Sequence, residues 1–213
     1  MTTVSTTAKS VPTTANDTRS RIADEALLSF AGRGYEATAL DALAAKLGIR
    51  KQTILHHFGS KELLLEAVLQ RTVGEYALSI DAALGRAGTP WARLDAVVRA
   101  VFALTGQRPH TLALLREVGR LGPAWVVRLN EALDPLSQRA TEFVRSAMSP
   151  SRGPRDPRLV VLSAYASVIA AVTEVEVLRS LGVEPSARLA VRRRRELLAY
   201  LAEMLGVAEP STE

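Results

Sequence analysis

The sequence contains no cysteine, which excludes a disulfide framework and any metal site built on thiolates. Histidine is also scarce, because the 213 residues include only His56, His57 and His110. The adjacent pair would point about 100° apart on a helix, whereas two metal ligands on one helix face lie four residues apart. No strand pattern followed by a glycine-rich phosphate loop is present. We therefore predict no catalytic residue, no metal site and no cofactor, and a protein that is not an enzyme.

Long apolar runs are missing as well. No stretch free of charge approaches the roughly 20 residues that span a membrane, and the N-terminus lacks the charged region and apolar core of a signal peptide. These absences predict a soluble cytoplasmic protein. A hydrophobic fraction of 47% is ample for a core. Abundant alanine, leucine and arginine, with ten prolines that often stand at apparent helix starts, predict an all-α fold.

Acidic residues are absent from one particular stretch, positions 42–60. The same stretch contains Lys46, Arg50 and Lys51, and Lys61 follows directly after it. The whole chain has a net charge of +5 and a pI near 10, which permits nucleic-acid binding without demonstrating it. The local excess of positive charge is better evidence, because it would attract a phosphate backbone.

The residues from Thr38 to Lys61 predict a helix-turn-helix. Thr38 is placed to cap the first helix, with Asp41 three residues later to complete a capping box. Gly48 follows the first helix directly, where a tight reversal needs a residue that tolerates positive φ. Helical spacing gives this first helix one apolar face, which consists of Leu40, Leu43, Ala44 and Leu47.

The second helix of this motif runs from Arg50 to Phe58, with Ile54 and Phe58 four residues apart and facing inward. Its other face presents donors, an amide, a hydroxyl and a methyl group, which suit the reading of base edges in a major groove. These groups belong to Lys51, Gln52, Thr53 and His56. The alternative interpretation is the solvated, mildly basic face that any small helical hairpin carries.

Residues 18–68 resemble the N-terminal DNA-binding domain of the TetR family of bacterial transcriptional regulators. The resemblance rests on short motifs in the right order: Gly34-Tyr35 at the end of the first helix, the helix-turn-helix, His56-His57-Phe58, and Ser60-Lys61-Glu62-Leu63 at the start of a long fourth helix. It implies a DNA-binding regulator. The predicted DNA contacts are Thr38, Arg50, Lys51, Gln52, Thr53, His56, His57 and Lys61.

The chain departs from the family pattern at three positions of the second helix. The family often has serine where Arg50 stands and a small residue where Gln52 stands. Its common tyrosine, a phosphate contact, is replaced by Leu55, which lacks the hydroxyl. Gln52 therefore becomes a stronger candidate for a base contact.

Four segments follow from these patterns. Residues 1–17 are predicted to be a disordered tail, with a minor-groove arm carrying Lys9 as the alternative. Residues 18–62 form the helix-turn-helix domain, 63–207 a ligand-sensing and dimerisation domain, and 208–213 a polar tail. About nine helices are expected in total, including one from Pro157 to about Leu181 and a last one that begins at Glu184-Pro185. Whether 124–148 is one kinked helix or two stays open.

The larger domain is interpreted through the same resemblance. The family's dimers pair the last two helices of each subunit, and small residues along 159–178 would let a partner helix approach closely, although they would also suit the core helix of a monomer. The predicted interface of a homodimer contains Ala164, Ser167, Ala171, Leu197 and Leu201. A pocket between the middle helices is expected to bind a largely apolar small molecule. Its predicted lining is Phe102, Thr105, His110, Trp125, Glu142 and Tyr165.

These patterns predict a repressor that binds a near-palindromic operator as a homodimer and is released by its ligand. The identity of the ligand, its existence and the choice between repression and activation stay open. The alternative is a helical protein-interaction module without sequence-specific DNA binding. In that case, alanine at Lys51, Gln52 and Thr53 would leave function intact.

Overall fold

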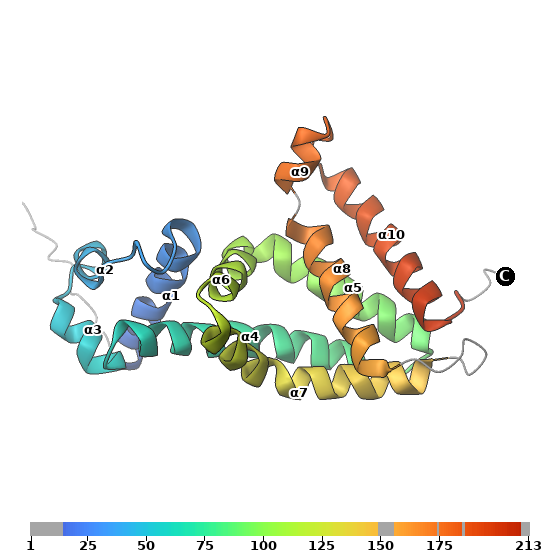
Figure 1. Cartoon of the computed structure of the whole chain (residues 1–213), viewed down its shortest axis with the longest axis horizontal. Helices are drawn as coiled ribbons and strands as arrows, with labels where there is room; N and C mark the ends of the chain where they lie inside the picture. The colour runs from blue at the N-terminus through green and yellow to red at the C-terminus, as the bar shows by residue number, and fades with distance from the viewer. Residues whose placement is uncertain (1–14, 149–155, 174, 185, 210–213) are drawn as a thin grey trace, which may run out of the picture. The chain divides into compact units, whose positions relative to one another are not determined.

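A computed structural model describes residues 15–148, 156–173, 175–184 and 186–209 (Figure 1). These residues form helices and no strand. The chain divides into two compact units, Met1–Val68 and Leu69–Glu213, and α4 contributes residues to both. The helices are α1 (Ala15–Arg33), α2 (Leu40–Leu47), α3 (Lys51–Phe58), α4 (Lys61–Leu84), α5 (Pro90–Gln107), α6 (Pro109–Arg120), α7 (Pro123–Ala147), α8 (Pro157–Thr173), α9 (Val175–Ser180) and α10 (Ala187–Leu205). No helix in the described ranges has the length and apolar character needed to cross a membrane.

The first unit is held together by apolar residues at helical spacing. Ile22, Ala26 and Phe30 lie on one face of α1, and each is 0% exposed. Helix α2 packs against α1 and α3, so the helix-turn-helix closes over this face. The buried residues that complete this core are Leu43 and Ala44 of α2, Ile54 and Phe58 of α3, and Leu64, Leu65 and Val68 of α4.

The predicted reversal between the two helices of the motif is confirmed at Gly48. Its φ of 66° and ψ of 30° place it in the left-handed region, where L side chains are strained. Its N–H donates to the Ala45 carbonyl at 3.2 Å, and the N–H of Ile49 donates to the Ala44 carbonyl at 3.0 Å. The glycine thus ends α2 and turns the chain into α3.

We expect Gly48→Ala to lower the free energy of unfolding of the first unit by about 1 kcal/mol, because an added Cβ strains the left-handed backbone. Crowding makes no contribution, since nothing lies within 4 Å of that Cβ. The matched control is Gly32→Ala in the last turns of α1, which also meets no neighbour within 4 Å but should stabilise by about 0.5 kcal/mol. Amide hydrogen exchange of residues 15–68 in the full chain measures both. Equal effects at the two glycines would contradict the conformational explanation.

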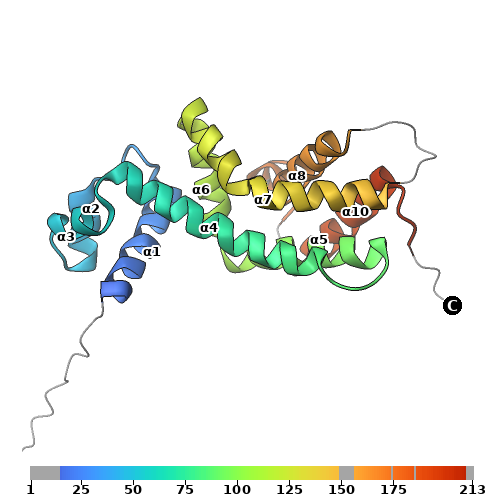
Figure 2. The ribbon, with the colours of Figure 1, turned by 90° about the horizontal axis from the view of Figure 1, so that it is seen from below.

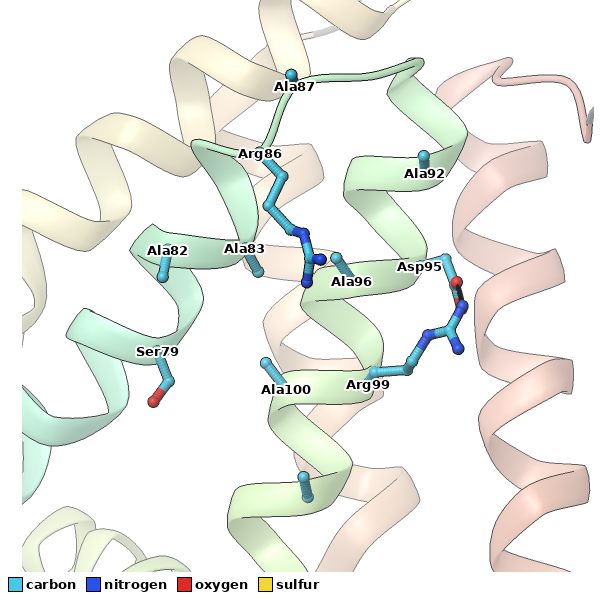
Figure 3. Close-up of a pocket in the computed structure, with 11 residues that line it drawn as sticks. Ser79, Ala82, Ala83, Arg86, Ala87, Ala92, Asp95, Ala96, Arg99 and Ala100 are labelled. Atoms are coloured by element: carbon cyan, nitrogen blue, oxygen red, sulfur yellow. Dashed lines mark hydrogen bonds and ion pairs between the residues drawn. The ribbon is translucent and has the colours of Figure 1, made fainter.

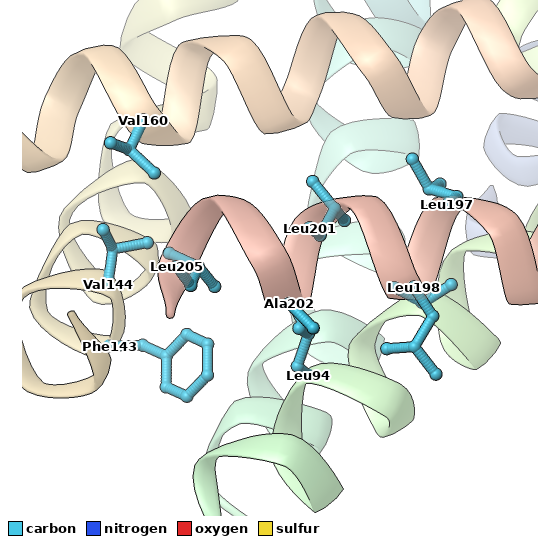
Figure 4. Packing of buried hydrophobic residues seen from close by; sticks show 10 residues of the cluster. Leu94, Phe143, Val144, Val160, Leu197, Leu198, Leu201, Ala202 and Leu205 are labelled. Atoms are coloured by element: carbon cyan, nitrogen blue, oxygen red, sulfur yellow. The ribbon is translucent and has the colours of Figure 1, made fainter. Parts of the chain in front are cut away.

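The second unit is built around α5, α7, α8 and α10. Helix α8 packs against α7, α10 and α5, and α10 also packs against α5 (Figures 1 and 2). Figure 4 shows the side chains that these helices direct toward one another. The core cluster comprises Leu94, Val98, Phe143, Val144, Val160, Leu197, Leu198, Leu201, Ala202 and Leu205.

Thr89 caps α5 as the Thr-Pro pair predicts. Its hydroxyl oxygen accepts a hydrogen bond from the N–H of Ala92 at 3.2 Å, and Pro90 occupies the first helical position, where no N–H is needed. Helix α7 decides the question left open for 124–148, because it continues through Pro135 as one helix. Proline costs one backbone hydrogen bond, and the buried Leu129 and Phe143 anchor α7 on either side of it.

Two helix boundaries differ from the prediction. Helix α1 begins at Ala15, inside the segment 1–17 that was predicted to be a disordered tail. The apolar segment expected to reach Leu181 is helical over Pro157–Thr173 and Val175–Ser180, with residue 174 outside the described residues. The last helix begins at Ala187 and not at Glu184-Pro185, because the Ser186 hydroxyl accepts from the N–H of Leu189 at 3.1 Å and acts as the N-cap. Residues 1–14, 149–155, 174, 185 and 210–213 lie outside the described residues, and they include most of the predicted N-terminal tail.

Candidate nucleic-acid interface

Helix α3 has one buried side and one polar side, as predicted. Ile54 is 0% exposed and Phe58 is 6% exposed, so two residues one turn apart fasten α3 to the rest of the first unit. Thr53 is half-buried at the edge of this contact. The outward-facing side chains are those of Lys51, Gln52 and His56, and together they offer hydrogen-bond donors and acceptors along two turns of helix.

The predicted role of Thr38 is wrong. Ala39, and not Thr38, is the N-cap of α2, and no side chain caps that helix. The Thr38 hydroxyl donates to the Gly34 carbonyl at 2.8 Å and also lies 3.3 Å from the Ser29 carbonyl. With 3% of its surface exposed, Thr38 joins the end of α1 to the start of α2, so its hydroxyl is already used within the fold.

Arg50 lies at the N-cap position of α3 in extended backbone conformation, and its carbonyl accepts from the N–H of Thr53 at 2.9 Å. Within the described residues, its exposed guanidinium has no hydrogen bond or ion pair. Arginine delivers up to five donors in a planar fork that matches phosphate oxygens. Arg50 is therefore available to an anion without giving up an existing contact.

The two lysines of the motif are already paired. The Nζ of Lys51 lies 2.9 Å from Oδ2 of Asp41 in α2, and the Nζ of Lys46 lies 2.6 Å from Oε1 of Glu25 in α1. Both pairs are partly exposed, so each is worth at most about 1 kcal/mol. Asp41 was expected to return a capping hydrogen bond, and the structure directs its carboxylate to Lys51 instead.

Arg19 holds the C-terminal end of α3, a contact that the sequence does not reveal because 38 residues separate the partners. Its guanidinium donates to the carbonyl of His57 and lies 4.4 Å from the centre of the Phe58 ring. A cation is favoured at this end of a helix. The half-buried His57 stands at this junction, and its ring contacts those of His56 and Phe58.

The start of α4 lies against the loop after α1. The Ser60 hydroxyl accepts from the N–H of Leu63 at 3.1 Å, so Ser60 caps α4. Lys61 extends across the Tyr35 ring, with its Nζ 4.3 Å from the ring centre. The same Nζ donates a hydrogen bond to the Glu36 carbonyl at 3.3 Å. Burial raises the pKa of the Tyr35 phenol, and the carboxylates of Glu62 and Glu36 raise that pKa further. The phenol thus stays protonated and neutral.

The second unit contains an open groove of about 820 Å³ between the end of α4 and α5 (Figure 3). Figure 3 shows the Arg86 side chain extending between the two helices and Arg99 directed toward Asp95, with which it forms an ion pair. In the described residues Arg86 has no side-chain partner. The rest of the lining is small and largely apolar: Ser79, Ala82, Ala83, Ala87, Ala92, Ala96, Ala100 and Ala103.

None of the predicted ligand-binding residues lines this groove. Phe102 and Trp125 are half-buried, whereas His110, Glu142 and Tyr165 are exposed, and the side chain of Thr105 lies outside the described residues. The predicted lining was chosen from polar residues that interrupt apolar segments, and this pattern did not locate the groove. The available signal was the alanine repeat of α5, at helical spacing on the side opposite the core residues Leu94, Val98 and Val101.

Two of the five predicted dimer residues are contradicted by their burial. Leu197 is 7% exposed and Leu201 is 4% exposed, because both point into the core of a single subunit. Ala164 packs against the same core. Ser167 is half-buried and donates to the Ser163 carbonyl, and the side chain of Ala171 lies outside the described residues. Among the side chains of α8 that the structure describes, the large apolar ones that are exposed are Leu159, Leu162 and Tyr165, with exposed fractions of 62%, 59% and 43%.

A tight α2–α3 reversal at Gly48, a polar face on α3 and basic residues around it define the class of helix-turn-helix domains. Residues 22–68 match the family model described as "Bacterial regulatory proteins, tetR family". This N-terminal part of the chain is therefore a DNA-binding domain of the TetR family type. It is 30% identical over 146 residues to the HTH-type transcriptional regulator BetI of Rhizobium meliloti, which is 68% of this chain and 64% of that protein.

Solved structures share the fold of most of the chain. The transcriptional regulator FadR from Bacillus subtilis in complex with stearoyl-CoA has a TM-score of 0.73 and 17% identity, over 89% of this chain and 99% of that chain. A transcriptional regulator from Saccharomonospora viridis in complex with choline has a TM-score of 0.69 and 22% identity, over 87% and 96%. This chain spans less than two thirds of the curated relatives that it matches. Those relatives are named as regulators, in agreement with the prediction that the chain is not an enzyme.

Proposed function

We propose that this protein is a homodimeric transcriptional regulator that binds a near-palindromic operator in the bacterial cytoplasm. The observation that carries the proposal is α3, whose buried face is fixed by Ile54 and Phe58 while Gln52 and His56 are exposed beside basic residues. Such a face meets the chemistry of base edges, and the cations around it meet phosphates. The favoured action is repression, in which the bound dimer blocks transcription.

The test is binding of the purified full chain to a pool of random DNA duplexes, followed by sequencing of the bound fraction at a stated moderate salt concentration. An enriched inverted repeat is the expected result, with its half-sites about one helical turn apart. Binding that is salt-sensitive but selects no sequence would contradict operator recognition. It would favour the protein-interaction module, which needs no reading of bases.

A homodimer requires a second copy to cover the exposed apolar face of α8. Leu159, Leu162 and Tyr165 fall on one side of that helix, and Tyr200 of α10 is 53% exposed. Helices α8 and α10 pack against each other, so these side chains belong to one helix pair. Large apolar side chains exposed together on a helix pair typically mark an interaction surface. The predicted choice of helices is retained, while the interface residues change.

The proposed effector site is the groove between α4 and α5. Alanines give it an apolar lining, and Arg86 supplies a cation without a partner in the described residues, so it suits a molecule with an apolar body and an anionic group. The choline bound by the Saccharomonospora regulator is a cation, and a groove with arginines and no aromatic ring offers no cation–π partner. The stearoyl-CoA bound by FadR combines an acyl chain with negative charge. The groove chemistry favours this second kind of ligand.

We expect dodecanoate to bind the protein and choline not to bind, as measured by isothermal titration calorimetry on the full chain. Arg86→Gln should weaken dodecanoate binding about tenfold, through loss of a charge-assisted hydrogen bond. Ala100→Leu should abolish binding by filling the groove. The control Arg116→Gln removes an exposed arginine of α6 and should change nothing. Unchanged affinity in both groove variants would place the ligand elsewhere.

The proposed switch acts through α4, which begins at Lys61 in the first unit and lines the groove near its end at Leu84. A ligand that binds better to one position of this helix shifts the population of conformers by its difference in affinity. In the proposed mechanism, the favoured conformer separates the two α3 helices by a distance that fits the operator poorly. Equal operator affinity with and without dodecanoate would contradict this step.

A further inference from the structure

In the first unit, the carboxylate of Asp41 lies beside the ammonium group of Lys51, one of the predicted DNA contacts. Asp41 lies in the first turn of α2 and brings its Oδ2 to 2.9 Å from the Nζ of Lys51, the first residue of α3. No other carboxylate is available from the motif itself, because positions 42–60 contain no acidic residue. Both side chains are reachable from solvent, since 71% of the Asp41 side chain and 46% of the Lys51 side chain are exposed.

The position of Lys51 makes an anionic partner favourable. A cation at the first residue of a helix lies beside the positive end of the helix dipole, which disfavours it, whereas an anion there is favoured. Lys51 and the start of α3 therefore both attract negative charge. In the free protein Asp41 supplies that charge. On DNA a phosphate oxygen or a base acceptor would supply it.

The other cations of the motif differ from Lys51 in this respect. Lys46 pairs with Glu25, of which only 21% of the side chain is exposed and which also accepts from the Ser29 hydroxyl, so this pair joins α1 to α2 within the fold. Arg50 has no partner among the described residues. Lys51 is the cation whose partner is both exposed and on the polar side of the motif.

We propose that Asp41 competes with DNA for Lys51, so that it acts as a built-in attenuator of DNA affinity. This inference rests on the proposed DNA-binding function. To bind, DNA must displace the Asp41 carboxylate from the lysine ammonium, and the lost ion pair lowers the affinity. The carboxylate then remains near the phosphates and repels them.

The test compares Asp41→Asn with wild type, using two probes: a random-sequence duplex and the inverted repeat selected from the random pool. Asp41→Asn should tighten binding up to about fivefold for each subunit. It should also steepen the slope of log K against log salt concentration by up to about 0.9 for each subunit, because Lys51 then releases a counterion without leaving a carboxylate behind. An equal gain on both probes assigns Lys51 to phosphate, and a larger gain on the inverted repeat assigns it to a base. Both support the competition.

Two controls isolate the ion pair. Glu36→Gln removes the same charge from an exposed position of the same unit and should have a smaller effect. In a Lys51→Met background, Asp41→Asn should raise the DNA affinity no more than Glu36→Gln does, because no ammonium group remains for which the carboxylate and DNA could compete. Weaker DNA binding by Asp41→Asn would overturn the proposal, since it would mean that Asp41 orients Lys51 for DNA.

The same experiments distinguish failure of the proposed operator binding from failure of the proposed competition by Asp41. If wild type selects an inverted repeat and Asp41→Asn matches Glu36→Gln, the competition is contradicted while the proposed function stands. If no sequence is selected but Asp41→Asn still tightens binding to random duplexes, operator recognition is contradicted and the competition stands. If neither protein binds DNA, both are contradicted.

Discussion

Replacing Gln52 and Thr53 together by alanine is expected to weaken binding to the selected inverted repeat on the order of a hundredfold or more. Each good base contact contributes about 1–3 kcal/mol, and the dimer would lose such contacts in both half-sites. Gln52 is exposed and Thr53 is half-buried. Neither side chain is part of the buried core, so the fold should persist.

Binding to random-sequence duplexes separates base reading from general attraction. The double variant keeps Arg50, Lys51 and Lys61, so its affinity for random DNA and its salt dependence should stay close to those of wild type. Gln107→Ala with Thr141→Ala removes the same side chains from the second unit and serves as the control. Unchanged binding of the inverted repeat by the Gln52 and Thr53 variant would contradict the role of α3 and favour the interaction module.

Placing glutamate at both Leu159 and Leu162 is expected to convert the proposed dimer to a monomer. In a dimer across the α8 face, each subunit would have to bury two carboxylates without partners, which costs several kcal/mol. The folded subunit should tolerate the change, because the two leucines are 62% and 59% exposed. Sedimentation velocity measures the assembly, and far-UV circular dichroism verifies that the helices remain.

The loss of assembly should also appear in DNA binding. A monomer contacts a single half-site, so the affinity for the inverted repeat should fall by at least two orders of magnitude, toward that for a half-site duplex. The control is Leu78→Glu on α4, which changes an even more exposed leucine, 73% accessible. If wild type and the α8 variant both sediment as dimers, the interface lies on another surface. If wild type itself sediments as a monomer, the proposed homodimer is contradicted.

Loss of the proposed dimer should weaken operator binding, whereas loss of base contacts should not affect assembly. Disruption of the α8 face should reduce operator binding even though α3 is untouched, because two reading helices spaced about 34–36 Å apart are needed for a full operator. Alanines at Gln52 and Thr53 should leave the dimer intact. This asymmetry distinguishes a loss of base contacts from a loss of assembly.

Local patterns predicted most of the first unit. Helical periodicity selected Ile54 and Phe58 as the buried side of α3, and the need for a left-handed residue selected Gly48. Both properties depend on a residue and its close neighbours in the chain, so they can be predicted from the sequence. The caps at Ser60 and Thr89 are local in the same way, because each hydroxyl accepts from a backbone N–H three residues later.

These local patterns could not predict contacts between residues that are far apart in the sequence. Thr38 has the chemistry of a cap, but the fold buries it against the carbonyls of Gly34 and Ser29. Asp41 has two possible partners in sequence, a backbone N–H and a lysine, and the crossing of α2 over α3 selected Lys51. Arg19 reaches α3 only because α1 packs beside it.

The sequence by itself determined the helical class, the helix-turn-helix and the polar residues of α3, because spacing, caps and glycine conformation act over a few residues. Only the tertiary structure decided which apolar faces stay open. Leu197 and Leu201 share the composition of an interface, yet they complete the subunit core, while Leu159 and Leu162 remain exposed. A helix with apolar residues on most sides does not specify which side its neighbours will cover. That choice is made by packing among segments far apart in the chain.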